Sequence, residues 1–305
     1  MTIHFDPSAP YDVEEMDTPF ARPEGKELVA RVYHPRGAPA APRAALVDVH
    51  GGAWARNDRT AGAVHGRGLA ACGLVVVALD FRQAPDHRHP AASADVAAGV
   101  RYVRAHAGRL GVDPTRVGLS GSSSGGQLAL LVGVKPGAPE HATTPIVRPD
   151  GSLDGAPGDD SVAFVLALYP VADPLARYRY ARSRENETPP PSGFDAKRLI
   201  ASHHAYFADE AAMADASVTR IVSAGDARAL PPVWVAQPEL DDNVPASITE
   251  AFVRAYRRAG GRLELAHFPG ARHGFIGQAS ADSDKCVVLM RDFIARELAR
   301  LEGRA

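Results

Sequence analysis

Three neighbouring serines lie in a glycine-rich turn, Gly121-Ser-Ser-Ser-Gly-Gly126. The turn follows the apolar run RVGLS and precedes the helix-like segment QLALLVG. A Gly-x-Ser-x-Gly placed between a strand and a helix is typical of a nucleophile elbow, because the strained turn excludes side chains two residues before and after the serine. Register selects Ser123, since neither Ser122 nor Ser124 has a glycine two residues away on both sides. The alternative is a serine-rich turn that only caps a helix.

A serine hydroxyl needs a base, and the base needs an acid to orient it. Both types of residue follow in the order Ser, Asp, His. Asp241 comes after the apolar run VWVAQ, and His273 comes after LELAHF. The carboxyl ends of strands are where sites form in open α/β sheets, so we expect these residues to meet Ser123. Asp242 and Glu239 remain alternatives for the acid, and a simple turn that caps the next helix remains an alternative role for the Asp-Asp-Asn cluster.

Small residues also follow an earlier apolar run, in the sequence ALVDVH-Gly51-Gly52-Ala53-Trp54. Without bulky side chains, the backbone N–H groups of such a loop can turn toward a developing oxyanion. A plain glycine turn beside a buried histidine is the alternative. The other histidines give no comparable signal. His87 and His89 lack the acidic or cysteine ligands of a zinc site, so we expect no metal.

These residues need a scaffold that brings strand ends together. Short runs rich in Val and Leu alternate with segments of helical period, which predicts a parallel sheet covered by helices on both faces. The expected strands are 28–33, 44–50, 74–80, 116–120, 162–168, 233–237 and 262–268. Apolar stripes predict helices over about 96–110 and 287–301.

Proline-rich stretches interrupt this alternation on both sides of the run VAFVLAL. We expect an irregular loop at about 135–160 and an insertion at about 173–223, within a single domain over 1–305. A long insertion between two sheet strands is commonly a lid or a binding loop.

The amino-acid composition limits the classes of partner that the protein can bind. The chain has 305 residues, of which 45% are hydrophobic, and 34 basic against 36 acidic side chains give a net charge of -2. This balance argues against nucleic acid and anionic membranes as partners. We find no membrane-spanning run or secretion signal and read the two cysteines as free thiols, so we expect a cytoplasmic protein. A homodimer is one assembly that the sequence leaves open.

With these motifs identified, the sequence resembles the hormone-sensitive-lipase-like carboxylesterases, a group within the α/β-hydrolase fold. The resemblance is carried by the elbow, the His-Gly-Gly loop, and the segments LDFRQAPDHRHPAASADV, GVDPTRVGLSGSSSGG and FPGARHGF. The resemblance implies a mostly parallel central sheet of about eight strands with a lid insertion. It also implies Ser123 as nucleophile, His273 as general base and acid, Asp241 as the orienting acid, and Gly51, Gly52 and Ser124 as oxyanion donors.

The resemblance implies a serine hydrolase that cleaves small to medium acyl or aryl esters through an acyl-serine intermediate, without a cofactor. The alternatives are an amidase-type enzyme, such as an arylformamidase or a peptidase, and a non-catalytic ligand-binding protein. Ala53 stands where the family often has a third glycine, a form also seen in arylformamidases. We expect an apolar substrate pocket lined by Trp54, Tyr169, Tyr206 and Phe207, which suits acyl or aromatic groups, although several of these could instead pack the insertion onto the body.

Overall fold

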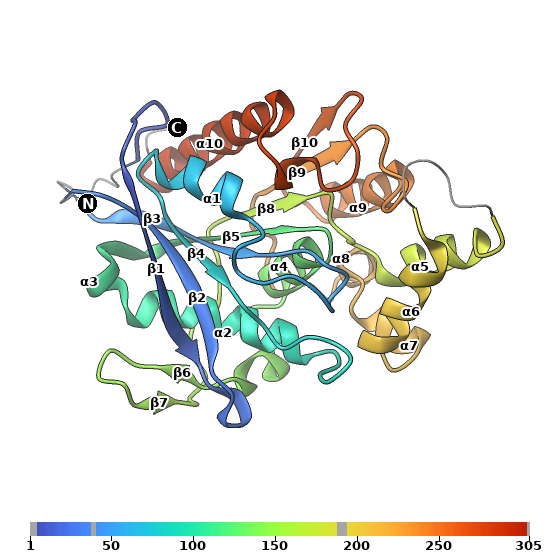
Figure 1. Ribbon diagram of the computed structural model, residues 1–305, viewed down its shortest axis with the longest axis horizontal. Coiled ribbons are helices and arrows are strands. Elements are labelled where there is room, and N and C mark those ends of the chain that lie inside the picture. The colour runs from blue at the N-terminus through green and yellow to red at the C-terminus, as the bar shows by residue number, and fades with distance from the viewer. Residues whose placement is uncertain (1–4, 38–40, 188–193, 304–305) are drawn as a thin grey trace.

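The computed structural model describes residues 5–37, 41–187 and 194–303 (Figure 1). One sheet organises these residues, and its strand order is β10-β9-β8-β5-β3-β4-β2-β1-β6-β7. The strands are β1 (Val13–Ala21), β2 (Leu28–Pro35), β3 (Arg43–Val49), β4 (Val75–Leu79), β5 (Val112–Ser122), β6 (Ile146–Val147), β7 (Leu153–Asp154), β8 (Val165–Leu168), β9 (Val233–Pro238) and β10 (Leu263–Phe268).

Six neighbouring strands, β4, β3, β5, β8, β9 and β10, pair in parallel, whereas β2, β1, β6 and β7 extend the sheet by antiparallel pairing. The predicted α/β class and mostly parallel sheet are confirmed. The expected number of about eight strands is too low, because the sheet has ten strands among the residues that the structure describes. The amphipathic strand β1 and the two-residue strands β6 and β7 lack the continuous apolar runs on which the expectation rested.

Helices connect and cover the strands. They are α1 (Ala63–Ala70), α2 (Ala91–Ala105), α3 (Ala107–Leu110), α4 (Ser124–Val134), α5 (Pro174–Ser183), α6 (Ala196–Tyr206), α7 (Glu210–Asp215), α8 (Val218–Ala224), α9 (Ala246–Arg258) and α10 (Ala281–Leu301), with 3-10 turns η1 (Pro23–Gly25), η2 (Pro139–Thr143) and η3 (Phe275–Gly277). Among the described residues, no helix combines the length and apolar character needed to cross a bilayer.

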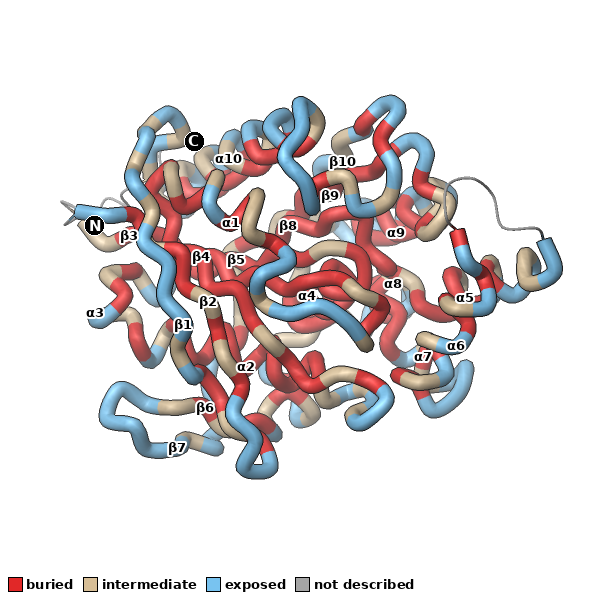
Figure 2. The backbone as a smooth tube through the Cα atoms, viewed as in Figure 1, coloured by how far each residue is buried: buried red, intermediate tan, exposed pale blue. Residues whose placement is uncertain are grey.

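Side chains alternate between the two faces of the sheet, which produces two cores. On one face Leu46 and Val76 pack with α1 and α10, including Met290. On the other face Val47 and Val77 pack with α2, α4 and α9. Figure 2 shows the central strands buried between these layers and long exposed stretches along the outer strand β1 and in the loop between β6 and β7.

The two proline-rich regions differ in structure. The region 135–160 contains only η2 and the short pair β6 and β7, close to the irregular loop that the sequence predicts. The region 173–223 folds into α5, α6, α7 and most of α8, apart from 188–193, which lie outside the described residues. Figure 1 shows α5, α6 and α7 together at the right-hand end of the molecule, so this region forms a helical layer beside the sheet.

A buried ion pair joins α1 to the middle of the sheet. Asp48 on β3 accepts hydrogen bonds on its Oδ1 from Ser120 Oγ on β5 (2.5 Å) and from His65 Nε2 (3.0 Å), and all three residues are buried. Burial alone would raise the pKa of Asp48, but His65 and the two hydrogen bonds outweigh it and lower that pKa. Burial lowers the pKa of His65, yet Asp48 raises it overall, above its ordinary 6.5.

This pair makes stability depend on pH. A raised folded-state pKa means that protonated His65 stabilises the fold fully below pH 6.5, and that this contribution is lost as pH rises through the folded value. The Asp48 contribution is lost only in acid, below its ordinary value of 3.8. We predict that His65→Gln lowers the free energy of unfolding by about 1–3 kcal/mol at pH 6 and by less at pH 9. Denaturant unfolding across this range, with His87→Gln as control, measures the effect, and a deficit that does not vary with pH would contradict it.

Candidate active site

Ser123 lies in the turn between β5 and α4, in a backbone conformation that side-chain-bearing residues rarely adopt (φ 53°, ψ −117°). Its flanking glycines are sterically required. A Cβ on Gly121 would come within 2.3 Å of Gly125 O, and one on Gly125 would come within 2.1 Å of Val49 O. The Ser123 N–H donates to Leu168 O on β8 (2.8 Å), and its carbonyl accepts from Val171 N (3.0 Å). The neighbouring strands therefore hold the strained turn in place.

His273 bridges Ser123 and Asp241. Its Nε2 lies 2.9 Å from Ser123 Oγ, and its Nδ1 lies 2.8 Å from Asp241 Oδ2. The histidine follows β10 and the aspartate follows β9, whose carboxyl ends are adjacent because these strands pair in parallel. The Tyr169 ring packs edge-on against His273, with centroids 4.7 Å apart. This arrangement can remove the serine proton and stabilise the imidazolium that forms.

Backbone donors determine which acid contacts His273. The other carboxylate oxygen of Asp241, Oδ1, accepts from Asn243 N (2.9 Å) and Val244 N (2.8 Å), and its side chain is fully buried. Glu239, an alternative from the sequence, instead accepts from Gly270 N (2.8 Å). The structure thus places Asp241 beside His273.

The loop after β3 lies against the serine turn. Gly51 O accepts from Asn57 Nδ2 (3.1 Å), and Trp54 N donates to Ser124 Oγ (3.2 Å). The Gly51 N–H, expected to be an oxyanion donor, instead donates to Ser122 Oγ (3.1 Å), so the expectation for this residue is wrong in the structure.

Two of the expected donors remain available. Within the described chain, the N–H groups of Gly52 and Ser124 have no hydrogen-bond acceptor, and the N–H of Ala53 also has none. A Cβ on Gly52 would come within 2.1 Å of Arg56 O, and its φ is +125°, so this position requires glycine. The sequence does not predict Ala53 as a donor, because alanine carries a side chain and the glycines beside it do not. Its own φ of 53° allows the loop to continue turning.

The expected aromatic pocket is wrong for three of its four residues. Trp54, Tyr206 and Phe207 are fully buried and pack on one another, with the Trp54 and Tyr206 rings stacked at 5.1 Å. The Trp54 Nε1 donates to Gln127 Oε1 on α4 (3.0 Å). This cluster therefore anchors the loop to α4 and α6 instead of contacting a substrate. Of the four predicted residues, only Tyr169 lines the cavity at Ser123.

That cavity has a volume of about 270 Å³ and is lined by both Ser123 and His273. Its wall is more polar than the sequence predicts. Arg56 from the loop after β3, Arg177 from α5 and Arg198 from α6 all line it, together with Asn57 and Asn243. Sequence reasoning missed these arginines, since arginine is frequent on protein surfaces and nothing in their spacing groups them.

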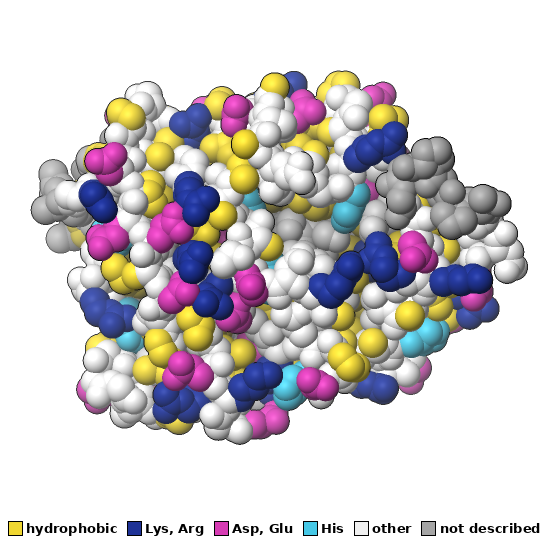
Figure 3. All heavy atoms as spheres, viewed as in Figure 1, with side chains coloured by type: hydrophobic (Ala, Val, Ile, Leu, Met, Phe, Trp, Pro, Cys, Tyr) yellow, Lys and Arg dark blue, Asp and Glu magenta, His cyan; other side chains and the backbone are white. Residues whose placement is uncertain are grey.

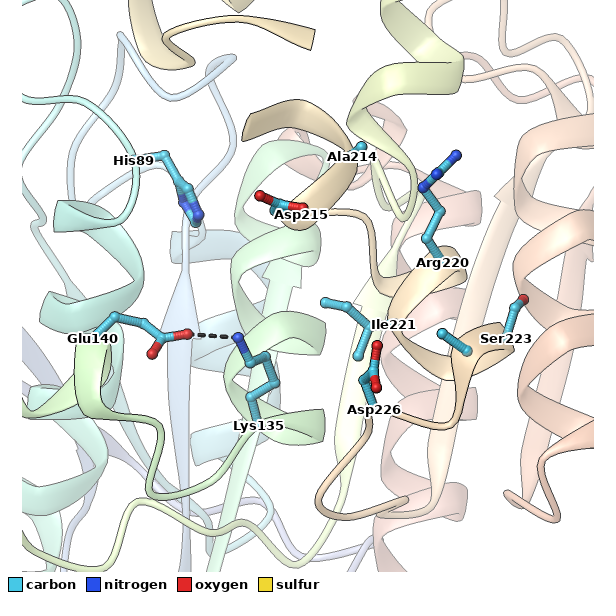
Figure 4. A pocket seen from close by; sticks show the side chains of 10 residues that line it. His89, Lys135, Glu140, Ala214, Asp215, Arg220, Ile221, Ser223 and Asp226 are labelled. Carbon is cyan, nitrogen blue, oxygen red and sulfur yellow. Dashed lines mark hydrogen bonds and ion pairs between the residues drawn. The ribbon is translucent and has the colours of Figure 1, made fainter. Parts of the chain in front are cut away.

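A larger hollow of about 960 Å³ lies elsewhere and shares no lining residue with the catalytic cavity (Figure 4). Lys135 and Glu140 form an ion pair across it (2.6 Å), and burial lowers the pKa of His89 to about 4. Within the part of the chain that the structure describes, no group of three or more His, Cys, Asp or Glu side chains is placed to hold a metal ion.

Known proteins are similar to this chain in sequence and in fold. A family profile described as the alpha/beta hydrolase fold matches residues 46–277. Esterase LipC of Mycobacterium tuberculosis is 30% identical over 80% of this chain, and the chain spans 56% of the length of LipC. Ethyl acetate hydrolase of Pseudomonas putida is 26% identical over 90% of this chain and 80% of its own. The crystal structure of EstE1, a carboxylesterase cloned from a metagenomic library, superposes with a TM-score of 0.73 at 24% identity, covering 94% and 90% of the two chains.

The geometry predicts an activated nucleophile. A fluorophosphonate probe should label wild-type protein at Ser123, and Asp241→Asn should slow labelling by about 10³–10⁴-fold, because the asparagine stabilises the wrong tautomer of His273. Mass spectrometry of the labelled peptide gives the site, and the time course gives the rate. The matched control is Asp242→Asn, one residue further along, which should label within a few-fold of wild type. Equal loss in both variants would contradict the role of Asp241.

Proposed function

Because this chain belongs to the α/β-hydrolase family, whose profile matches residues 46–277, we propose that it is a serine esterase. Its substrates are small to medium carboxylic esters, which it cleaves through an acyl-Ser123 intermediate. The observation that carries the proposal is the hydrogen-bonded chain from Ser123 through His273 to Asp241, with unoccupied backbone N–H groups beside the serine. The family resemblance inferred from the sequence motifs is confirmed by the profile match and by the esterase relatives.

The reaction follows from the positions of these groups. Ser123 Oγ attacks the ester carbonyl carbon while His273 Nε2 accepts its proton. Negative charge then grows on the carbonyl oxygen, where the N–H groups of Gly52, Ala53 and Ser124 stabilise it. Protonated His273 donates its proton to the departing alcohol as the carbon–oxygen bond breaks. In the second half of the reaction, a water molecule gives a proton to His273 and attacks the carbonyl carbon of the acyl-serine. The bond to Ser123 Oγ then breaks, His273 returns the proton to Oγ, and the carboxylic acid is released.

We propose that residues 173–223 form the cap of this site. Arg177, Arg198 and Leu199, all from this region, line the cavity that also contains Ser123. The cap is tied to the catalytic loops, since Arg177 Nη1 donates to Asn243 Oδ1 (3.0 Å) and Tyr180 Oη donates to Asp242 O (3.0 Å). The body supplies the reacting groups and the cap supplies part of the substrate wall.

Two buried, unpaired cysteines, Cys72 and Cys286, support the cytoplasmic location that we propose. Burial raises the pKa of Cys286 above its ordinary value, so its thiol stays protonated and unreactive.

Esters should be better substrates than amides. We predict that 4-nitrophenyl acetate is turned over at least about tenfold faster than an aryl formamide, because relatives such as ethyl acetate hydrolase act on an ester. Ser123→Ala should lower ester hydrolysis by about 10⁴-fold or more. Steady-state kinetics on both substrates measure this. Faster formamide turnover would favour the amidase alternative, and full activity of Ser123→Ala would overturn the mechanism.

The glycine loop gives a separate prediction. Gly52→Ala should lower kcat for 4-nitrophenyl acetate by about 10²–10³-fold, because the added Cβ displaces the loop that carries the oxyanion donors. Ser124→Ala is the control, since it removes an acceptor for Trp54 N but keeps its own backbone N–H, and it should stay within about tenfold of wild type. Circular dichroism checks that both variants fold. Wild-type kcat in folded Gly52→Ala would exclude this loop from the oxyanion site.

A further inference from the structure

Three arginines share the catalytic cavity without an acidic partner. Arg56, Arg177 and Arg198 all line it, and none forms an ion pair within 4.0 Å with any described residue. By contrast, other arginines of the cap are paired, as Arg179 is with Glu210 (2.9 Å). Three arginine side chains therefore lie around the catalytic serine without a directly paired acid among the described residues.

Arg177 is the most unusual of the three, because it is only 1% exposed. Its Nη1 donates to Asn243, while Nε and Nη2 are buried without a hydrogen-bond partner. The guanidinium carbon lies 5.3 Å from the centroid of the Trp54 ring, which offsets only part of the cost of burying a cation. Burial and the charge of Arg198 lower the pKa of Arg177 to about 9, so it remains charged at neutral pH.

The other two arginines of the cavity wall are more exposed than Arg177. Arg198 is half-buried and Arg56 is exposed, and within the described chain neither guanidinium has a hydrogen-bond partner. Asp195, the acid whose charge acts on Arg198, uses its Oδ1 to cap α6 through Arg198 N (2.9 Å). Figure 3 shows Lys and Arg side chains over the cap region, beside the hollow at the centre of that face.

A buried charge without a partner is costly unless a ligand supplies the opposite charge. The planar fork of arginine matches a carboxylate, which it can hold through two hydrogen bonds. We propose that the ester hydrolysed here carries a carboxylate, which Arg198 and Arg56 bind directly while Arg177 supplies positive charge behind them. This inference rests on the proposed esterase function and narrows its substrate class to small anionic esters.

One other role for Arg177 uses the same contacts. Through Asn243, whose N–H donates to Asp241, Arg177 could serve only to position the acid of the catalytic chain. Loss of such a positioning residue would slow neutral and anionic esters equally. Loss of a charge that stabilises the bound carboxylate would slow only the anionic ester, so the ratio of the two rates separates these roles.

The test compares esters matched in shape and different in charge. Monoethyl glutarate carries the carboxylate on the acyl side, and its neutral partner is ethyl 5-methylhexanoate. On the alcohol side, 4-acetoxybenzoate is compared with 4-isopropylphenyl acetate. Proton release in a pH-stat gives kcat/KM for each. Wild type should prefer the anionic member of at least one pair by about 10–100-fold, as expected for charge-assisted hydrogen bonds. The preferred pair identifies the side of the ester that faces the arginines.

Variants assign the preference to the arginines. Arg198→Gln should reduce the preference to within about threefold of unity, and Arg198→Glu should reverse it, because a carboxylate there repels the substrate. Arg177→Met tests the buried charge. If that variant does not fold, the two Arg198 variants still decide the outcome. Arg179→Gln removes the same charge from the exposed face of the same cap and should keep the wild-type preference.

Equal rates for both members of each pair, unchanged by Arg198→Gln, would overturn the inference and leave the esterase function intact. A preference that Arg179→Gln abolishes as fully as Arg198→Gln would also overturn it, because general surface charge would then be the cause. Failure to hydrolyse any of the four esters or 4-nitrophenyl acetate would overturn the esterase function and the inference together.

Discussion

The strained turn at Ser123 is the constraint on which the site depends. A positive φ at a residue with a side chain is unfavourable, so surrounding structure must hold it there. Here β5 enters the turn, α4 leaves it, and hydrogen bonds to Leu168 and from Val171 fasten it to the next strand. The conformation lifts the Ser123 hydroxyl toward His273 and leaves the Ser124 N–H at the free end of α4. Nucleophile and oxyanion donor are therefore positioned by one turn.

The parallel sheet supplies the remaining groups by geometry alone. Strands β3, β5, β9 and β10 run in the same direction, so the residues that follow them meet at one edge. The glycine loop, the serine turn, Asp241 and His273 occupy these four positions. Beneath them lies the buried Asp48–His65 pair, which links β3 to α1. Asp48 stands two residues before His50, and it also accepts a hydrogen bond from Ser120 on β5. A side-chain hydrogen bond between β3 and β5 and an ion pair between β3 and α1 thus add to the backbone pairing beneath the catalytic edge.

Local requirements explain which features could be predicted from the sequence. Glycines at 121 and 125 are demanded by contacts within one turn, and apolar runs without alternation mark strands covered on both faces, so the elbow and the parallel sheet were predictable. For the acid that orients His273, the sequence leaves three candidates. Asp241 is distinguished in the structure by the backbone N–H groups of Asn243 and Val244, which hold its carboxylate. The Gly51 expectation was wrong because Ser122, a residue 71 positions away, accepts its N–H.

The pocket could not be predicted from the sequence, because the side chains that line it are those that the hydrophobic core does not bury. Trp54, Tyr206 and Phe207 are stabilised more by mutual packing than by facing a small cavity, so they form the foundation under the loop. Arginines from three separate segments then line the space that the aromatic side chains leave. The stacked aromatic cluster makes this arrangement tolerable, since the Trp54 face receives the Arg177 cation while its Nε1 donates to Gln127. A single tryptophan thereby connects the oxyanion loop, the nucleophile helix and the charge of the substrate wall, so the two halves of the site are built on the same side chain.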